Sequence, residues 1–207
     1  MSTPATVSLR SIPHALNWHV WPSAFAVKRG ALTITSGPRT DLFIDPRGEV
    51  ISTNSPLALF ATEGDCILSA RVNVPFVSTY DAGVLVAYVD KTHWAKLCFE
   101  FSPQGQPMIV SVVTKGESDD CNSAVIDGNA VYLRLARIGN AFAFHYSLDG
   151  AAKSWHMVRY FDLGSGTDAR RGRIGLSSQS PTGAGCTATF DAIRFKSRTL
   201  SNIRSGL

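Results

Sequence analysis

The residues best suited to chemistry are concentrated in one short run of the chain, from Trp94 to Glu100. Side chains alternate between the two faces of a β-strand, so in an extended run one face would carry Trp94, Lys96, Cys98 and Glu100. The other face, ending at Phe101, is apolar and is predicted to face a core. A large aromatic ring in line with a base and an acid is typical of a sugar-binding groove, where the ring stacks on the sugar and the charged groups bind its hydroxyls. The alternative is structural, with Lys96 and Glu100 solvated or paired with neighbouring strands.

A second carboxylate precedes this run. Asp81 opens another strand-like segment, in which it shares a face with Gly83 and Leu85. If the two segments pair, Asp81 and Glu100 could approach each other as a protonated acid and an ionised base or nucleophile, the minimum machinery for glycoside hydrolysis. The sequence therefore leaves a second hypothesis open, an enzyme that uses this carboxyl pair to act on sugar-like or other small metabolites. The alternative assigns Asp81 to its own turn, where its carboxylate accepts hydrogen bonds from backbone amides.

The cysteines, histidines and acidic pairs form no recognisable metal or cofactor motif. The four cysteines, Cys66, Cys98, Cys121 and Cys186, are too far apart for a CxxC pair, and the five histidines are isolated. Asp119-Asp120 is an acidic pair, but no Asp-x-Asp loop surrounds it, and it is interpreted as a solvated loop. We therefore expect neither a metal nor a cofactor.

Positive charge is concentrated in the last third of the chain. Residues 1–133 carry 9 Lys and Arg against 12 Asp and Glu, whereas residues 134–207 carry 11 against 4. Nucleic-acid binding needs clustered cations, but here they are divided between Arg170-Arg171-Gly172-Arg173 and a set spread along a strand and its tail: Arg194, Lys196, Arg198 and Arg204. We interpret them as solvated basic loops and expect no nucleic-acid partner.

The sequence pattern predicts that the candidate site residues lie on β-strands, and that the rest of the chain is built from strands as well. Runs of alternating or β-branched residues, separated by Gly-, Pro- and Asp-containing turns, recur about every dozen residues: 31–35, 66–74, 83–89, 94–101, 108–114, 131–138, 141–148, 155–161, 172–178 and 187–195. Gly139-Asn140 is a two-residue loop that predicts a hairpin between 131–138 and 141–147. Because a helical period is missing, we predict an all-β sandwich of two antiparallel sheets.

The segment from residue 10 to residue 196 is predicted to be one domain, followed by a C-terminal tail over residues 197–207. Apolar runs are too short for a membrane-spanning helix, which needs about 18 or more residues. The N-terminus lacks the basic start and apolar block of a secretory signal. We expect a cytoplasmic protein without a membrane partner.

Taken in order, several short motifs resemble one known family. They are Trp18, Leu32-Thr-Ile-Thr35, Thr40-Asp-Leu-Phe43, Tyr80-Asp-Ala-Gly83, Trp94-Ala-Lys96 with Glu100, Val112-Val-Thr114 before Ser118-Asp119, Leu133-Arg-Leu135, Tyr146-Ser-Leu-Asp-Gly150 with Trp155, Gly175-Leu176 and Phe190-Asp191. Across about residues 16–195 this set is similar to the regulation-of-enolase-like domain family. Members often place a Trp after the Ser-Asp motif, where this chain has Asp120-Cys121.

The resemblance implies the concanavalin A-like jelly-roll sandwich of lectins and glucanases. It also implies a ligand groove on the concave sheet, with these positions matching its recurrent polar and aromatic residues: Asp81, Trp94, Lys96, Glu100, Thr114 and Arg134, with Tyr80 beside them. Our first hypothesis is a non-catalytic domain that binds a carbohydrate or another polar small ligand in this groove. The enzyme with a Glu100 and Asp81 pair is the second, and a protein-interaction or regulatory module is the third.

Overall fold

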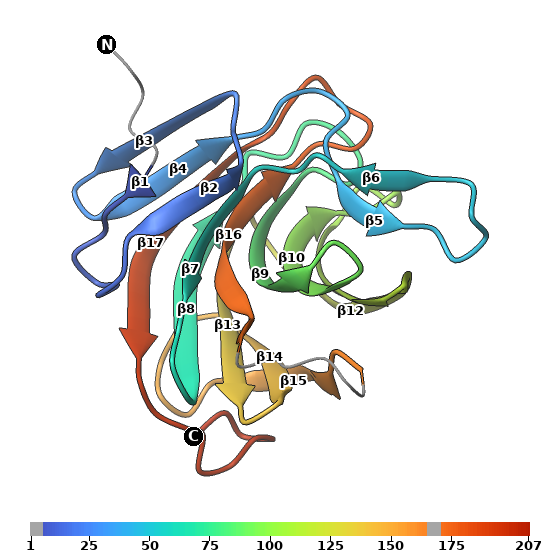
Figure 1. Ribbon diagram of the computed structural model, residues 1–207. Helices are drawn as coiled ribbons and strands as arrows, with labels where there is room; N and C mark the ends of the chain where they lie inside the picture. Colours follow the sequence, from blue (N-terminus) through green and yellow to red (C-terminus); the bar gives the residue numbers. More distant parts are fainter. Residues whose placement is uncertain (1–5, 165–170) are drawn as a thin grey trace.

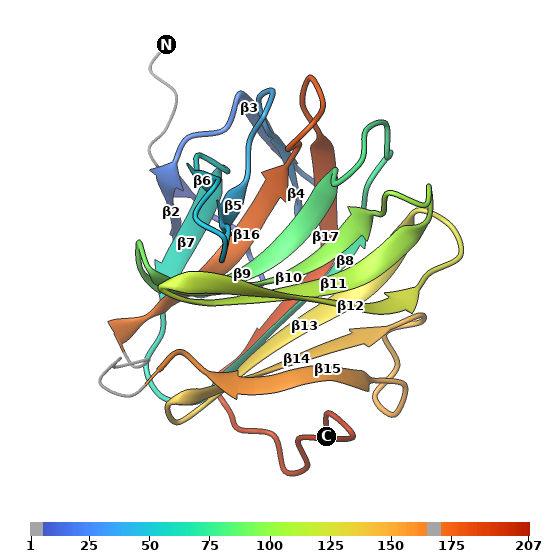
Figure 2. The same cartoon turned by 90° about the vertical axis from the view of Figure 1, so that its right-hand side faces the viewer.

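The chain folds into two large antiparallel β-sheets that pack face to face, as Figure 2 shows in a side view of the layers. The structure is a computed structural model and describes residues 6–164 and 171–207. Within these ranges there is no α-helix. The predicted all-β, concanavalin A-like jelly-roll sandwich is confirmed.

Sheet A contains eight strands and carries the Trp94–Glu100 run. Its order is β1 (Thr6–Val7), β2 (Leu16–Val20), β7 (Leu57–Ala61), β16 (Arg173–Gln179), β9 (Ala82–Asp90), β10 (His93–Phe101), β11 (Pro107–Lys115) and β12 (Glu117–Val125). Neighbours far apart in sequence, such as β16 and β9, lie side by side (Figure 1).

Sheet B contains seven strands. Its order is β15 (His156–Asp162), β14 (Ala141–Ser147), β13 (Ala130–Ile138), β8 (Cys66–Asn73), β17 (Thr187–Lys196), β4 (Ala31–Thr35) and β3 (Ala24–Lys28). The predicted hairpin is present, because Ile138 pairs with Ala141 across Gly139-Asn140.

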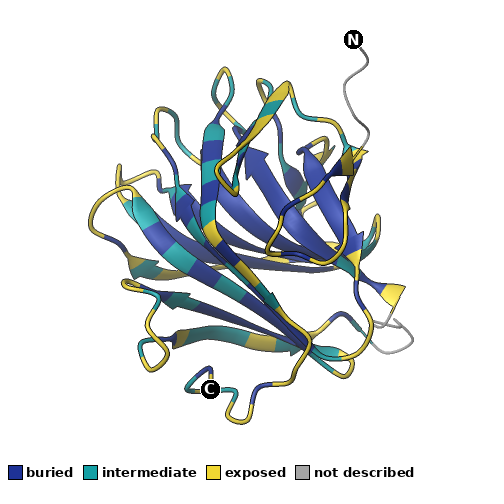
Figure 3. Cartoon of the chain, turned by 90° about the vertical axis from the view of Figure 1, so that its left-hand side faces the viewer, coloured by how far each residue is buried: buried dark blue, intermediate teal, exposed yellow. Residues whose placement is uncertain are grey.

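The core lies between the sheets and is built from the apolar faces that alternation predicts. Leu97 and Phe99 of β10 join Leu133 and Leu135 of β13 in one buried cluster. Figure 3 shows that buried residues lie along the strands of the two sheets and that exposed residues are concentrated in the loops. Burying such side chains is the dominant stabilising contribution to a domain of this size.

All ten predicted strands exist with ends shifted by at most two residues, but seven further strands escaped the pattern. They are β1, β2, β3, β7, β12 and the pair β5 (Leu42–Ile44) and β6 (Ile51–Thr53). β12 is largely polar because it is an exposed edge strand, and β7 is continuously apolar because both of its faces are covered. Neither strand shows the alternation on which the prediction relied.

The hairpin of β5 and β6 covers part of the face of sheet A that turns away from sheet B (Figure 1). Leu42 on β5 packs in a small buried cluster with Trp94, Val86 and Val112. The backbone N–H of Ile44 donates a hydrogen bond to Ser118 Oγ on β12 at 2.9 Å. This hairpin therefore divides the outer face of sheet A into a covered part and an open part.

The predicted tail, residues 197–207, packs on the outer face of sheet B rather than extending away from it, as Figure 2 shows. Leu200 is buried against Ile67, Ala136 and Ala143. In the described part of the chain, no helix has the length and apolar character needed to cross a membrane.

Candidate functional site

The open part of the outer face of sheet A holds a pocket of about 310 Å³, which we call the sheet-A pocket. Its polar lining consists of Asp41, Lys96, Glu100, Asp120 and Gln179. Its walls are formed by Phe43, Tyr80, Val112, Pro181 and Thr182. The pocket lies on the face of sheet A that carries Lys96 and Glu100.

Strand pairing brings the central polar residues together. Lys96 lies opposite Val112 on β11, and Val112 lies opposite Asp120 on β12, so the two charged residues flank a valine on one face. Gln179, at the end of β16, lies opposite Ala82, which itself lies opposite Glu100. Residues from three separate parts of the chain thus converge on one pocket.

A continuous chain of hydrogen bonds links four of these side chains. Lys96 Nζ donates to Asp41 Oδ1 at 2.8 Å and to Gln179 Oε1 at 2.9 Å. Gln179 Nε2 then donates to Glu100 Oε2 at 3.2 Å and to the backbone oxygen of Tyr80 at 3.3 Å. The amide of Gln179 therefore connects the base to the acid while holding both in place.

Burial and neighbouring charges determine the protonation states of Glu100 and Lys96. Burial raises the pKa of Glu100 to about 8, against the opposing charge of Lys96 and with help from Asp120 and Asp41. Burial alone would lower the pKa of Lys96, but the charge of Asp41 overcomes it and the pKa is raised. Near neutral pH Lys96 is therefore a cation, and Glu100 is mostly a neutral acid.

Asp120 adds a third ionisable group at the solvent-facing rim. Its side chain is exposed, yet partial desolvation raises its pKa, with Asp41 and Asp119 adding to the effect and with Lys96 and a backbone hydrogen bond from Cys121 opposing it. Because a carboxylate accepts several hydrogen bonds, Asp120 can still accept one from a ligand that enters the pocket.

The pocket keeps unused hydrogen-bonding capacity. An ammonium group has three donors, and two of those of Lys96 have acceptors within residues 6–164 and 171–207. In the same ranges Glu100 makes a hydrogen bond through Oε2 and none through Oε1. One donor of Lys96 and one oxygen of Glu100 are thus available to a polar ligand.

Trp94 and Thr114 lie on the predicted face but not in the pocket. Trp94 is fully buried under Leu42 and Leu57, so its ring is closed to a sugar. Thr114 is equally buried, and its Oγ1 lies 2.9 Å from Ser118 Oγ in a hydrogen bond. The aromatic residues that do line the pocket are Tyr80, which was expected there, and Phe43.

Asp81 serves its own turn and does not line the sheet-A pocket. Ala82 is the partner of Glu100, so Asp81, one residue earlier, falls on the opposite face. Its carboxylate accepts hydrogen bonds from the backbone of Ser78 at 2.8 Å and from Ser180 Oγ at 2.6 Å. The carboxyl groups that share the pocket with Glu100 are instead those of Asp41 and Asp120.

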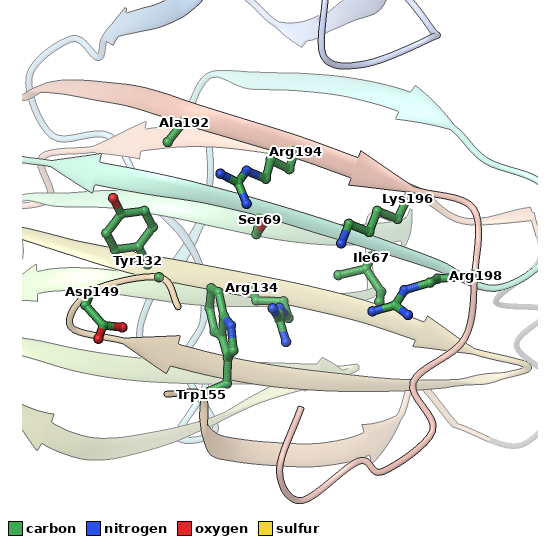
Figure 4. Close-up of a pocket in the computed structure, with 11 residues that line it drawn as sticks. Ile67, Ser69, Tyr132, Arg134, Asp149, Trp155, Ala192, Arg194, Lys196 and Arg198 are labelled. Atoms are coloured by element: carbon green, nitrogen blue, oxygen red, sulfur yellow. The ribbon is translucent and has the colours of Figure 1, made fainter. Parts of the chain in front are cut away.

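Arg134 lies on the other sheet. It belongs to β13 of sheet B and points away from the core, beside Trp155 (Figure 4). The expectation of one groove containing both Arg134 and Lys96 is therefore corrected, because an ordered set of motifs does not say which strands share a sheet.

Several lining residues were not predicted from the sequence as site residues, among them Asp41, Phe43, Asp120 and Gln179. Two of them had a signal, since Asp41 and Phe43 belong to the Thr40-Asp-Leu-Phe43 motif. Asp120 was interpreted as part of a solvated loop, whereas it lies on β12 with its side chain at the pocket. In the described residues, no group of three or more His, Cys, Asp or Glu side chains is arranged to hold a metal ion.

The fold and the site together define a concanavalin A-like sandwich with a polar pocket on an exposed sheet face. The chain belongs to the family described as "Protein of unknown function (DUF1349)", which matches residues 18–198. The similarity to regulation-of-enolase-like domains that the motifs indicated is confirmed by a curated relative, "Regulation of enolase protein 1" from Saccharomyces cerevisiae. It is 27% identical over 144 residues, 69% of this chain and 71% of the relative.

Solved structures show the same fold. A functionally unknown protein from Saccharomyces cerevisiae superposes with a TM-score of 0.78 at 23% identity, covering 88% of this chain and 96% of that one. The GH43 protein BlXynB from Bacillus licheniformis gives a TM-score of 0.70 at 16% identity, and the match covers 88% of this chain but 37% of the larger protein. An alginate lyase from Klebsiella pneumoniae gives 0.51 at 13% identity over 83% of both chains.

Proposed function

We propose that this protein binds a carbohydrate or a similar polar small ligand in the sheet-A pocket, without catalysis of its own. The observation that carries the proposal is the buried chain from Lys96 through Gln179 to Glu100, which opens into that pocket. Burying a charged base and an acid costs free energy that apolar residues of the same volume would not. Because the fold does not require these buried polar groups, ligand binding is a reason for their presence.

The chemistry of the lining suits hydroxyl groups. Lys96 and the protonated Glu100 donate hydrogen bonds, while Asp120 and Asp41 accept them, so a sugar hydroxyl, which both donates and accepts, is matched on each side. Tyr80 and Phe43 supply apolar surface for the C–H face of a ring. A volume of about 310 Å³ suits one or two sugar rings rather than a long chain. Several proteins of similar fold are sugar enzymes by name, which supports the same ligand class.

A second candidate, an enzyme acting on sugar-like or other small metabolites, is favoured by one observation. Glu100, with its pKa raised to about 8, is a protonated acid near neutral pH, and Asp120 lines the same pocket as a second carboxyl group. These are the two roles that glycoside hydrolysis requires. A protein-interaction or regulatory role is supported by the name of the yeast relative.

The test uses a glycan array followed by calorimetry on the wild type and three variants. We expect Asp120→Asn and Glu100→Gln each to weaken binding by about tenfold, roughly the loss of one hydrogen bond to the ligand. Asp119→Asn is the matched control, because Asp119 is exposed and pairs with Arg159 outside the pocket. Absence of binding to every glycan, or binding unchanged in both pocket variants, would overturn the proposal.

Hydrolysis of the bound glycan, followed by product analysis, separates the two candidates. Turnover that Glu100→Gln and Asp120→Asn each abolish would establish the enzyme. Binding without turnover establishes the non-catalytic domain.

A further inference from the structure

A second pocket, of about 110 Å³, lies on the outer face of sheet B, and we call it the sheet-B pocket. Its lining includes four cations, which Figure 4 shows around one hollow: Arg134, Arg194, Lys196 and Arg198. Asp149 is the acidic residue of the lining. The three cations near the C-terminus were interpreted from the sequence as solvated and spread out, but the fold gathers them beside Arg134. Arg170, which the same interpretation included, lies outside the described residues.

The register of the paired strands explains why these cations lie close together. Ser69 on β8 lies opposite Arg134 on β13 and opposite Arg194 on β17, so a small side chain separates two arginines in one row. In the next row Lys196 lies opposite Ile67. Arg198 follows β17 and turns back toward Arg134 (Figure 4). The centre of the hollow is thus lined by short or apolar side chains and its edge by cations.

The positive charge of this pocket exceeds its negative charge, because among the described residues the four cations share it with a single carboxylate, that of Asp149. None of the four cations forms an ion pair inside the described ranges 6–164 and 171–207. Asp149 is already engaged by Ser154 Oγ and by the backbone N–H of Ala151. Burial, together with the positive charge of Arg198, lowers the pKa of Arg134 to about 10. The cations repel one another in the absence of an anion.

Arg134 is held rigidly and still has an unused donor. Its guanidinium lies 3.6 Å from the ring centroid of Trp155, and Nη1 donates to the backbone oxygen of Gly206 in the C-terminal segment. Its Nε and the indole Nε1 of Trp155 are buried, and neither has a hydrogen-bond acceptor in the described part of the chain. A guanidinium that is already held in place can bind an anion with little further loss of side-chain entropy.

We propose that the sheet-B pocket is a second ligand site, which binds a phosphate or sulfate group carried by a small molecule. A tetrahedral oxyanion offers several acceptor oxygens, and arginine is the side chain that best binds such groups through paired N–H donors. The volume fits such a group and leaves the rest of the ligand outside. A nucleic acid would need cations along a longer track to neutralise successive phosphates, whereas these four surround one hollow.

The experiment measures binding to the full chain by calorimetry and thermal shift, at constant ionic strength. The probes are inorganic phosphate, inorganic sulfate, a hexose 6-phosphate, a hexose 6-sulfate and the unmodified hexose. We expect saturable binding of the anions, with the phosphate and sulfate arms distinguishing the two sources of the group. The double variant Arg194→Gln and Arg198→Gln is expected to lose at least about tenfold in affinity, because two charge-assisted contacts are removed. Both residues are exposed, so the variant is expected to fold.

Arg204→Gln is the matched control, since Arg204 is an exposed cation of the same segment that does not line the pocket. It should bind the anions like the wild type. Inorganic phosphate and sulfate carry no sugar, so their binding reports on the sheet-B pocket, and failure of one site is distinguishable from failure of the other. Equal affinity of the double variant and the wild type would overturn the proposal. So would binding of single-stranded DNA with a steep salt dependence and no binding of the small anions, which would identify a nucleic-acid surface instead.

Discussion

Burial sets the protonation state of Glu100. The unfolded chain ionises this carboxyl near its ordinary pKa of 4.5 and the folded chain near 8, so the native state holds more protons between these values. The stabilising contribution is therefore complete below about pH 4.5 and is lost as the pH rises through about 8. In the folded protein the acid stays neutral until the pH approaches its pKa, so a site that relies on the neutral acid should weaken only as the pH rises through about 8.

We predict that the wild type loses on the order of 3 kcal/mol of unfolding free energy relative to Glu100→Gln between pH 5 and pH 8. Glutamine keeps the shape of the side chain and its contact with Gln179 but does not ionise. Urea unfolding at both pH values measures the difference. Parallel pH dependence of the two proteins would show that Glu100 ionises freely in the folded state.

Asp81 has a structural role, and a variant can distinguish this role from ligand binding in the sheet-A pocket. Asp81→Asn replaces a carboxylate that accepts hydrogen bonds from the backbone of Val77 and Ser78 and from Ser180 Oγ. We predict a loss of about 1–3 kcal/mol in unfolding free energy, with unchanged ligand affinity in the folded protein. Asp120→Asn should show the opposite pattern, unchanged stability and weakened binding. Calorimetry and urea unfolding on both variants decide the assignment.

At the scale of the strands, close packing limits which residues the sheets accept. Gly175 on β16 lies opposite Leu59 on β7, and a Cβ atom at this glycine would overlap the backbone oxygen of Ala58. The strands can pair at their present spacing because this position lacks a side chain. The pairing matters to the site, since β16 carries Gln179 to the pocket.

Gly175→Ala is therefore predicted to cost at least about 3 kcal/mol of unfolding free energy. Gly139→Ala is the contrasting variant: its Cβ meets open space, but φ is +57°, so the cost is expected to be about 1–2 kcal/mol. Thermal unfolding of the two variants measures which substitution is the more destabilising. Equal destabilisation would show that β7 and β16 separate at little cost.

For the molecule as a whole, the C-terminal segment is part of the folded structure. Leu200 is 6% exposed and packs on sheet B, and the backbone oxygen of Ile203 accepts a hydrogen bond from His145 Nε2 at 2.6 Å. The same segment supplies Arg198 to the sheet-B pocket and the Gly206 contact that holds Arg134. Its loss should affect both stability and that pocket.

We predict that Leu200→Ala lowers the unfolding free energy by about 2 kcal/mol and the Tm by about 4–8 °C. Leu207→Ala removes the same side chain from a position that is 39% exposed and should cost less than about 0.5 kcal/mol. Differential scanning calorimetry of the two variants tests the difference. A Tm unchanged by Leu200→Ala would mean that the segment contributes little to the folded state.

By itself, the sequence determined the features that depend on neighbouring residues. Alternation along a strand is local, so ten strands, the hairpin at Gly139-Asn140 and the shared face of Lys96 and Glu100 could all be predicted from it. The ordered motifs added the fold family. Strands without alternation, such as β7 and β12, escaped because their burial depends on what covers them.

Only the tertiary structure decided which distant residues meet. Lys96 contacts Asp41, 55 positions away, and Gln179, 83 positions away, through strand pairings that no local pattern specifies. The same pairings turn Asp81 to the face opposite Glu100 and place Arg134 on the other sheet, among cations that looked dispersed along the chain. The physical reason is that a side chain's face follows from its own strand, whereas its partners follow from the order and register of all the strands in the sheet.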